Sequence, residues 1–130
     1  MQKKTILAID DTAMQLHALI KILQPIYSVK VAKDGETGLE FAQKSNIDLI
    51  FLDMVMPGMS GLEVLEALKA SDKTKNIPVI LATGSTSAEN QQKGFDLGAA
   101  CYIQKPFEQE KVMQSINQVL GYTNPHLKPR

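Results

Sequence analysis

Residues 48–61 read DLIFLDMVMPGMSG, and this stretch decides the fold. It opens with an apolar run of β-branched and aromatic residues that ends at Asp53, a pattern typical of a buried strand. A loop containing proline and glycine follows, and Ser60 is placed to cap a leucine-rich helix. The stretch therefore predicts a strand, a loop and a helix, with an acidic side chain at the carboxyl end of the strand.

The same unit recurs along the chain. Short apolar runs typical of strands occupy residues Thr5–Ile9, 27–32, 48–52, 78–82 and 100–103. Each run is followed by a segment with helical spacing of its apolar residues, and Gly121 closes the last of these helices. Five strand–helix units in succession predict an α/β domain, with a parallel sheet that helices cover on both faces.

Three segments are less regular. Asp34-Gly35 predicts a turn. Residues 86–89, TSAE, have the form of a capping box, so a fourth helix is expected to begin there. That helix is polar and contains Gly94, which costs up to about 1 kcal/mol relative to alanine, so we expect it to be the least stable helix. Residues 123–130 contain two prolines and no periodicity, which predicts a tail after a domain of residues 1–122.

The composition argues against several classes of protein. Fourteen basic and fourteen acidic residues balance, without the basic excess that is usual in proteins that bind nucleic acid directly. No apolar run approaches the ~20 residues of a membrane helix. The apolar run before Asp10 is too short for a signal peptide, and the single cysteine, Cys101, cannot form an internal disulfide. We therefore expect a cytoplasmic protein that binds neither nucleic acid nor membrane directly.

Polar side chains gather at the carboxyl ends of the predicted strands. Asp10 and Asp11 follow the first strand, Asp53 the third, Thr83 the fourth and Lys105 the fifth. Ligands bind at this edge in open α/β sheets. Three carboxylates repel one another, and Mg²⁺ suits such a cluster because it also accepts water and phosphate oxygens. A lysine and a hydroxyl can position a phosphoryl group, and a carboxylate can act as its nucleophile. The sequence therefore has the groups for Mg²⁺-dependent phosphoryl transfer.

As a set, these motifs resemble the receiver domains of two-component response regulators. The resemblance covers about residues 4–121 and is carried by Asp10-Asp11, Asp53-Met54-Val55-Met56-Pro57 with Gly61, Thr83 and Lys105-Pro106-Phe107. It implies a flavodoxin-like (βα)5 fold, with a doubly wound parallel five-stranded sheet in the order 2-1-3-4-5. It also implies a phosphoacceptor switch rather than an enzyme, one that catalyses its own Mg²⁺-dependent phosphorylation and slow dephosphorylation.

The resemblance assigns a role to individual residues. Asp53 would be the phosphoacceptor. Mg²⁺, which Mn²⁺ could replace, would be held by Asp10, Asp11, Asp53 and the backbone carbonyl of Val55. The phosphoryl group would contact Thr83, Gly84, Lys105 and Met54. The side chains that switch would be Thr83 and Tyr102, and the peptide bond before Pro106 would be cis.

Partners are implied as well. The phosphoryl group would come from a phosphohistidine on a sensor histidine kinase or a histidine phosphotransfer protein. Because no output domain follows Gly121, we expect an apparently single-domain regulator. Its downstream protein target would bind the face formed by the fourth helix, the strand at 100–103 and the helix at 108–120. A shuttle in a multistep phosphorelay is equally compatible, and the chain could also be a piece of a larger regulator or hybrid kinase.

Two departures from the family pattern bear on rate. Gly84 stands where the family more often has alanine, and glycine makes that loop more permissive. Val55 and Ser85 occupy positions that line the path of the attacking water in the family. Because valine cannot orient a water, we expect slow self-dephosphorylation.

Three alternative functions compete with this one. A phosphatase of the haloacid dehalogenase kind uses a second acid two residues after its nucleophile, and this chain has Val55 there. A nucleotide-binding enzyme would show G-x-x-x-x-G-K-[ST] or G-x-G-x-x-G, and neither occurs. The third alternative is a receiver fold that serves only as a binding module and is never phosphorylated.

Overall fold

Strands and helices alternate throughout the computed structural model, which describes residues 3–84 and 88–121. Its elements are β1 (Thr5–Ile9), α1 (Ala13–Leu23), β2 (Ser28–Ala32), α2 (Gly35–Lys44), β3 (Leu49–Asp53), α3 (Gly61–Ala70), β4 (Val79–Thr83), α4 (Ala88–Asp96), β5 (Cys101–Gln104) and α5 (Gln109–Leu120). The strands form one parallel sheet in the order β2-β1-β3-β4-β5. The predicted fold class and strand order are therefore confirmed. Ser85, the first half of the predicted capping box and the predicted tail lie outside the described residues.

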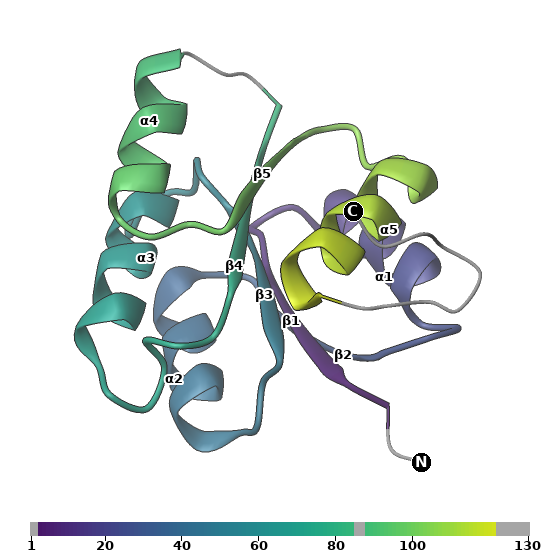
Figure 1. The fold of residues 1–130 in the computed structure, drawn as a ribbon, viewed down its shortest axis with the longest axis horizontal. Coiled ribbons are helices and arrows are strands. Elements are labelled where there is room, and N and C mark those ends of the chain that lie inside the picture. Colours follow the sequence, from purple (N-terminus) through teal and green to yellow (C-terminus); the bar gives the residue numbers. More distant parts are fainter. Residues whose placement is uncertain (1–2, 85–87, 122–130) are drawn as a thin grey trace.

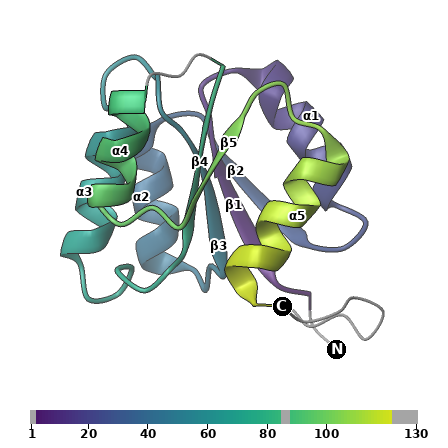
Figure 2. The ribbon, with the colours of Figure 1, turned by 45° about the horizontal axis from the view of Figure 1, so that its top comes forward.

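Helices cover both faces of the sheet. α1 and α5 lie against one face, and α2, α3 and α4 lie against the other (Figure 1 and Figure 2). Because successive side chains of a strand point to opposite faces, Phe51 packs in the core under α1 and α5, whereas Ile50 and Leu52 pack in the core under α2 and α3. This double burial explains why the central strands read as continuous apolar runs.

The strand order reverses between β1 and β3. From β1 the chain moves outward to β2 and then crosses back to β3, which lies on the other side of β1. Ligands bind at such a reversal in open α/β sheets. Ile9 at the end of β1 pairs with Leu52 in β3, so the next residues, Asp10 and Asp53, lie side by side at this edge of the sheet.

Asp34 begins a helix, which corrects the predicted turn. Its carboxylate accepts the backbone N–H of Thr37 at 2.7 Å, and α2 starts at the next residue, Gly35. Aspartate is favoured at this position because it satisfies an N–H that lacks a helical partner. Gly35 allows close packing on α3, because a Cβ there would lie 2.6 Å from Cγ2 of Val64. The dipeptide is therefore the cap and first residue of α2.

The expected caps of α3 and α5 are present. Ser60 Oγ accepts the N–H of Glu63 at 3.2 Å, and Glu63 Oε1 accepts the N–H of Ser60 at 2.9 Å. This capping box fixes where α3 begins, just after the loop that follows Asp53. Gly121 ends α5 in the left-handed conformation, with a φ of 67°. Within the described ranges, no helix has the length and apolar character needed to cross a membrane.

Candidate functional site

Three carboxylates and one ammonium group meet at the carboxyl edge of the sheet. Asp10 and Asp53 are each only 5% exposed, whereas Asp11 is exposed. Carboxylate oxygens of the three aspartates lie within 4.8 Å of one another. Lys105 reaches in from beyond β5, and its Nζ lies 2.7 Å from Oδ2 of Asp10 and 3.2 Å from Oδ1 of Asp53. The structure thus brings together four of the five polar residues that the strand ends predicted.

Asp10 connects this cluster to α1. Its Oδ1 accepts the backbone N–H of Thr12 at 2.9 Å, and its own backbone N–H donates to the carbonyl of Ala32 at 3.0 Å. Thr12 is the N-cap residue of α1, but its side chain makes no capping hydrogen bond. The carboxylate of Asp10 therefore takes over part of the capping, which holds the first turn of α1 beside the acidic cluster.

The backbone of Met54, directly after Asp53, is hydrogen-bonded through both its N–H and its carbonyl. The N–H of Met54 donates to Ala82 and its carbonyl accepts from Gly61, both at 3.0 Å. The N–H of Met54 is thus engaged in the sheet, and the expected contact of Met54 with the phosphoryl group stays a prediction. The backbone N–H of Val55 acts on the carboxylate of Asp53 and lowers its pKa.

The pKa of the Asp53 carboxyl is raised above its ordinary value. Burial is the main cause, and the carboxylate of Asp10 adds to it. Lys105 and the N–H of Val55 act in the opposite direction without cancelling the rise. A divalent cation with oxygen ligands fits this donor set, because it would neutralise carboxylates that are otherwise reluctant to ionise together.

In metal-free protein, Asp53→Asn should raise the thermal stability at pH 7. The pKa of Asp53 in the folded domain lies above the ordinary value of 3.8, which applies to the unfolded chain. Wild-type stability therefore falls as the pH rises from the unfolded pKa to the folded pKa. Asparagine at this position does not ionise, so the variant does not lose this stability. We expect Tm in chelator to rise by a few degrees at pH 7, the change that about 1 kcal/mol produces in a small domain. The gain should shrink at pH 4, and an equal gain at both pH values would contradict the raised pKa.

The remaining predicted residues surround the cluster. Thr83 is the last residue of β4 and is buried, and Gly84 follows it at the surface. Tyr102 in β5 is half-buried and packs against the core under α2 and α3. The peptide bond between Lys105 and Pro106 is cis. These placements put Thr83 and Gly84 at the same edge as Asp53, while the switching of Thr83 and Tyr102 stays a prediction.

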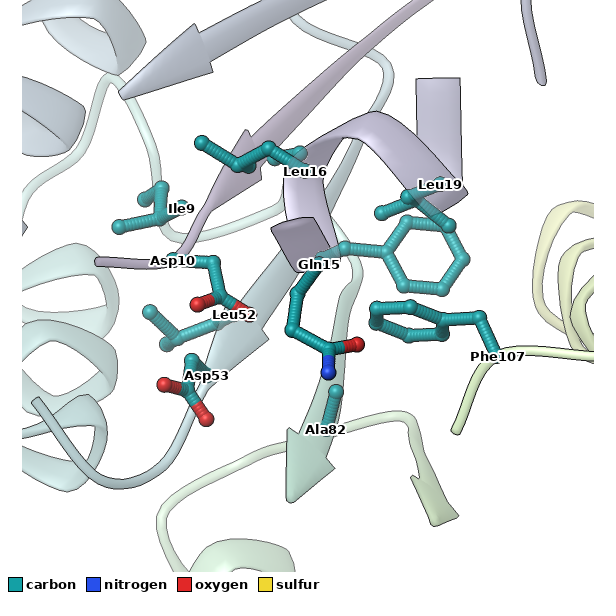
Figure 3. Close-up of a pocket in the computed structure, with 11 residues that line it drawn as sticks. Ile9, Asp10, Gln15, Leu16, Leu19, Leu52, Asp53, Ala82 and Phe107 are labelled. Atoms are coloured by element: carbon teal, nitrogen blue, oxygen red, sulfur yellow. The ribbon is translucent and has the colours of Figure 1, made fainter. Parts of the chain in front are cut away.

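A small pocket opens beside the two buried carboxylates (Figure 3). Most of its lining is apolar, and Phe107 forms one wall. The polar side chains in the lining are Asp10, Asp53 and Gln15. Sequence reasoning missed Gln15, which belongs to no motif. No local sequence signal marks it, because its place in the pocket depends on the distant Phe107.

Comparisons with known proteins show which family this chain resembles. The model of the response regulator receiver domain matches residues 6–117. Protein PilH from Pseudomonas aeruginosa is 31% identical over 117 residues, which are 89% of this chain and 97% of PilH. A probable cyclic di-GMP phosphodiesterase from Vibrio cholerae is 42% identical over 102 residues, 78% of this chain. The structure of chemotaxis protein CheY4 from Vibrio cholerae superposes with a TM-score of 0.87 at 34% identity, covering 91% of this chain and 99% of CheY4.

The match to the family model includes at least part of every strand and helix described above. The chain spans 23%, 52% and 48% of the lengths of three curated relatives, and thus about half or less of each. Receiver domains are phosphoacceptor switches that bind Mg²⁺ in an acidic pocket and interact with histidine kinases or phosphotransfer proteins and with downstream targets. On the evidence of its fold, its acidic cluster and these matches, this chain belongs to the response regulator receiver domain family of two-component signal transduction.

Proposed function

We propose that this domain accepts a phosphoryl group on Asp53. The observation that carries the proposal is the cluster itself, in which a buried carboxylate lies beside two others and 3.2 Å from the ammonium of Lys105. Mg²⁺, which Mn²⁺ could replace, would be held by Asp10, Asp11, Asp53 and the carbonyl of Val55. When bound, the cation supplies charge neutralisation for the carboxylates and the phosphoryl oxygens.

The transfer starts from a phosphohistidine whose imidazole is protonated on its other nitrogen. An Asp53 carboxylate oxygen forms a bond to phosphorus while the P–N bond breaks. The electron pair of the P–N bond leaves with the imidazole, which is then neutral. Lys105 pairs with the phosphoryl oxygens, and the hydroxyl of Thr83 and the N–H of Gly84 donate hydrogen bonds to them. These groups supply positioning and charge stabilisation, which are the main requirements of phosphoryl transfer.

A downstream partner would detect phosphorylation through a change in surface. A switch requires that the two states differ in affinity for the partner. The face of α4, β5 and α5 is the proposed contact, because Tyr102 lies in β5 and would turn inward together with Thr83. Phe95 of α4 is 45% exposed and would offer this face an apolar anchor.

Intact mass spectrometry tests the phosphoacceptor. The protein is incubated with Mg²⁺ and acetyl phosphate, with Asp53→Ala and a chelator sample as controls. We expect one phosphoryl increment that disappears in both controls. If wild-type protein gains no increment and does not bind beryllofluoride either, the domain is a binding module that retains the site without its chemistry.

Slow loss of the phosphoryl group is a further expectation. Val55 is 72% exposed next to the phosphoacceptor, and its side chain cannot orient an attacking water. In a Val55→Asn variant the amide can do so, and the phosphoryl half-life should shorten several-fold. The half-life is measured by intact mass after the donor is removed. Ile26→Asn, an apolar-to-amide change at another exposed position, is the matched control. An unchanged half-life in Val55→Asn would disprove the role of this position.

A further inference from the structure

Gln15 in α1 places a carboxamide beside the phosphoacceptor. Its side chain is half-buried and extends into the pocket, where the amide lies between Asp53 and Phe107 (Figure 3). Apart from the two carboxylates, it is the one polar side chain among the residues that line this pocket. The pocket therefore combines two negatively charged groups and one neutral hydrogen-bonding group within mostly apolar walls.

The carboxamide of Gln15 is uncommitted. In residues 3–84 and 88–121 it forms no hydrogen bond to another protein group, whereas the amide of Gln43 donates to Ser71 at 3.0 Å and that of Gln92 donates to Asp96 at 2.9 Å. A glutamine offers two N–H donors and one acceptor oxygen. Gln15 therefore has donors available beside Asp53, and apolar surroundings strengthen any hydrogen bond that they make to a charged group.

The first turn of α1, which carries Gln15, is tied to the acidic cluster through Thr12. The N–H of Thr12 is bonded to Asp10, and the N–H of Leu16 donates to the carbonyl of Thr12 at 3.1 Å. On the opposite wall, Phe107 packs edge-to-face on Phe51 with their ring centroids 6.3 Å apart. A donor held on a fixed helical turn needs little rearrangement when charge arrives in front of it.

We propose that Gln15 donates an amide hydrogen bond to the phosphoryl group as it is transferred to Asp53, which makes it a further catalytic residue. This inference rests on the proposed function. With acetyl phosphate, an oxygen of Asp53 bonds to phosphorus while the P–O bond to the acetyl group breaks, and the electron pair leaves with acetate. No proton moves in this step. The group that Gln15 recognises is thus an anionic phosphoryl group, for which a neutral N–H is a suitable ligand.

Gln15→Met tests the proposal, because methionine has a similar length and cannot donate. The single-turnover phosphorylation rate with acetyl phosphate is measured at saturating Mg²⁺, and beryllofluoride affinity is measured by ¹⁹F NMR. Both should fall by about tenfold, the typical effect of losing a hydrogen bond to a charged group. Mg²⁺ affinity and Tm should stay at the wild-type values. Gln118→Met, at an exposed position of α5, is the matched control and should match wild type in every measurement.

The outcomes separate this inference from the proposed function. Wild-type protein that takes up no phosphoryl group would overturn the proposed function, and the role of Gln15 with it. Wild-type protein that is phosphorylated no faster than Gln15→Met would overturn the role of Gln15 alone. A slower variant whose Mg²⁺ affinity and Tm also fall would show that α1 has shifted, which would overturn a direct contact with the phosphoryl group.

Discussion

Lys105→Met should destabilise the metal-free domain by about 3 kcal/mol at pH 7. The ammonium of Lys105 lies 2.7 Å from a carboxylate oxygen of Asp10 and 3.2 Å from one of Asp53, and all three side chains are nearly inaccessible to solvent. Methionine fills similar space but leaves two buried carboxylates facing each other without a cation. Uncompensated buried charge is among the largest single causes of instability.

The deficit of Lys105→Met should depend on pH. Lys105 lowers the pKa of Asp53, so in its absence the pKa of that carboxyl rises further above its ordinary value. Lower pH favours the protonated carboxyl of Asp53, which relieves the repulsion, so the deficit should be smaller at pH 5 than at pH 7. Thermal denaturation in chelator at pH 7 and pH 5 measures this change. Lys44→Met removes an exposed ion pair with Glu40 and should cost little at either pH. Equal deficits for the two variants would contradict a buried charge cluster.

Phosphorylation of Lys105→Met should be slower by about a hundredfold or more, the typical effect of removing one preorganised donor from a developing oxyanion. The rate is followed by intact mass with acetyl phosphate and saturating Mg²⁺, conditions under which the metal offsets part of the loss of stability. Lys44→Met should be phosphorylated at the wild-type rate, because its side chain lies on the surface of α2. A Lys105→Met variant that reacts as fast as wild type would exclude Lys105 from the transfer.

Gly61→Ala should be the most damaging methyl addition near the site. An added Cβ would lie 2.3 Å from the backbone oxygen of Asp53 and 2.6 Å from Cα of Met54. Both contacts are with backbone, so α3 and the loop after β3 have to separate. We expect a loss of about 3 kcal/mol in the free energy of unfolding, at the upper end of typical overpacking. Urea denaturation measures it.

The same change should weaken Mg²⁺ binding. Gly61 donates its N–H to the carbonyl of Met54, next to the Val55 carbonyl proposed as a metal ligand. Gly84→Ala is the matched control for stability, because a Cβ there meets no atom of residues 3–84 and 88–121 within 4 Å. Its free energy of unfolding should change by less than about 1 kcal/mol. If Gly61→Ala is as stable as Gly84→Ala and binds Mg²⁺ as tightly as wild type, the close approach of α3 has no part in the site.

The sequence predicted the centre of the site because strand ends carry it. Parallel strands share one edge, so Asp10, Asp53 and Lys105 could be placed together once the strands were recognised. The capping box at Ser60 was equally accessible, since it depends on residues three apart. These features are local or follow from topology alone.

Other features depend on contacts between distant segments. The approach of Gly61 to Asp53 depends on how closely α3 packs on β3, which no local pattern shows. The N–H of Met54 donates to Ala82 of β4, a pairing that lies beyond the end of the predicted strand. Gln15 becomes relevant only because Phe107, far away in the sequence, encloses the same pocket.

One carboxylate oxygen of Asp10 accepts the N–H of Thr12, and the other accepts a hydrogen bond from the ammonium of Lys105. Any event that draws Lys105 towards a phosphoryl group changes the electron density on the oxygen that Thr12 faces. The amide proton of Thr12 is therefore a built-in spectroscopic reporter of what occupies the site. Its resonance in a ¹H–¹⁵N spectrum would follow phosphorylation in real time, with neither a partner protein nor a labelled donor.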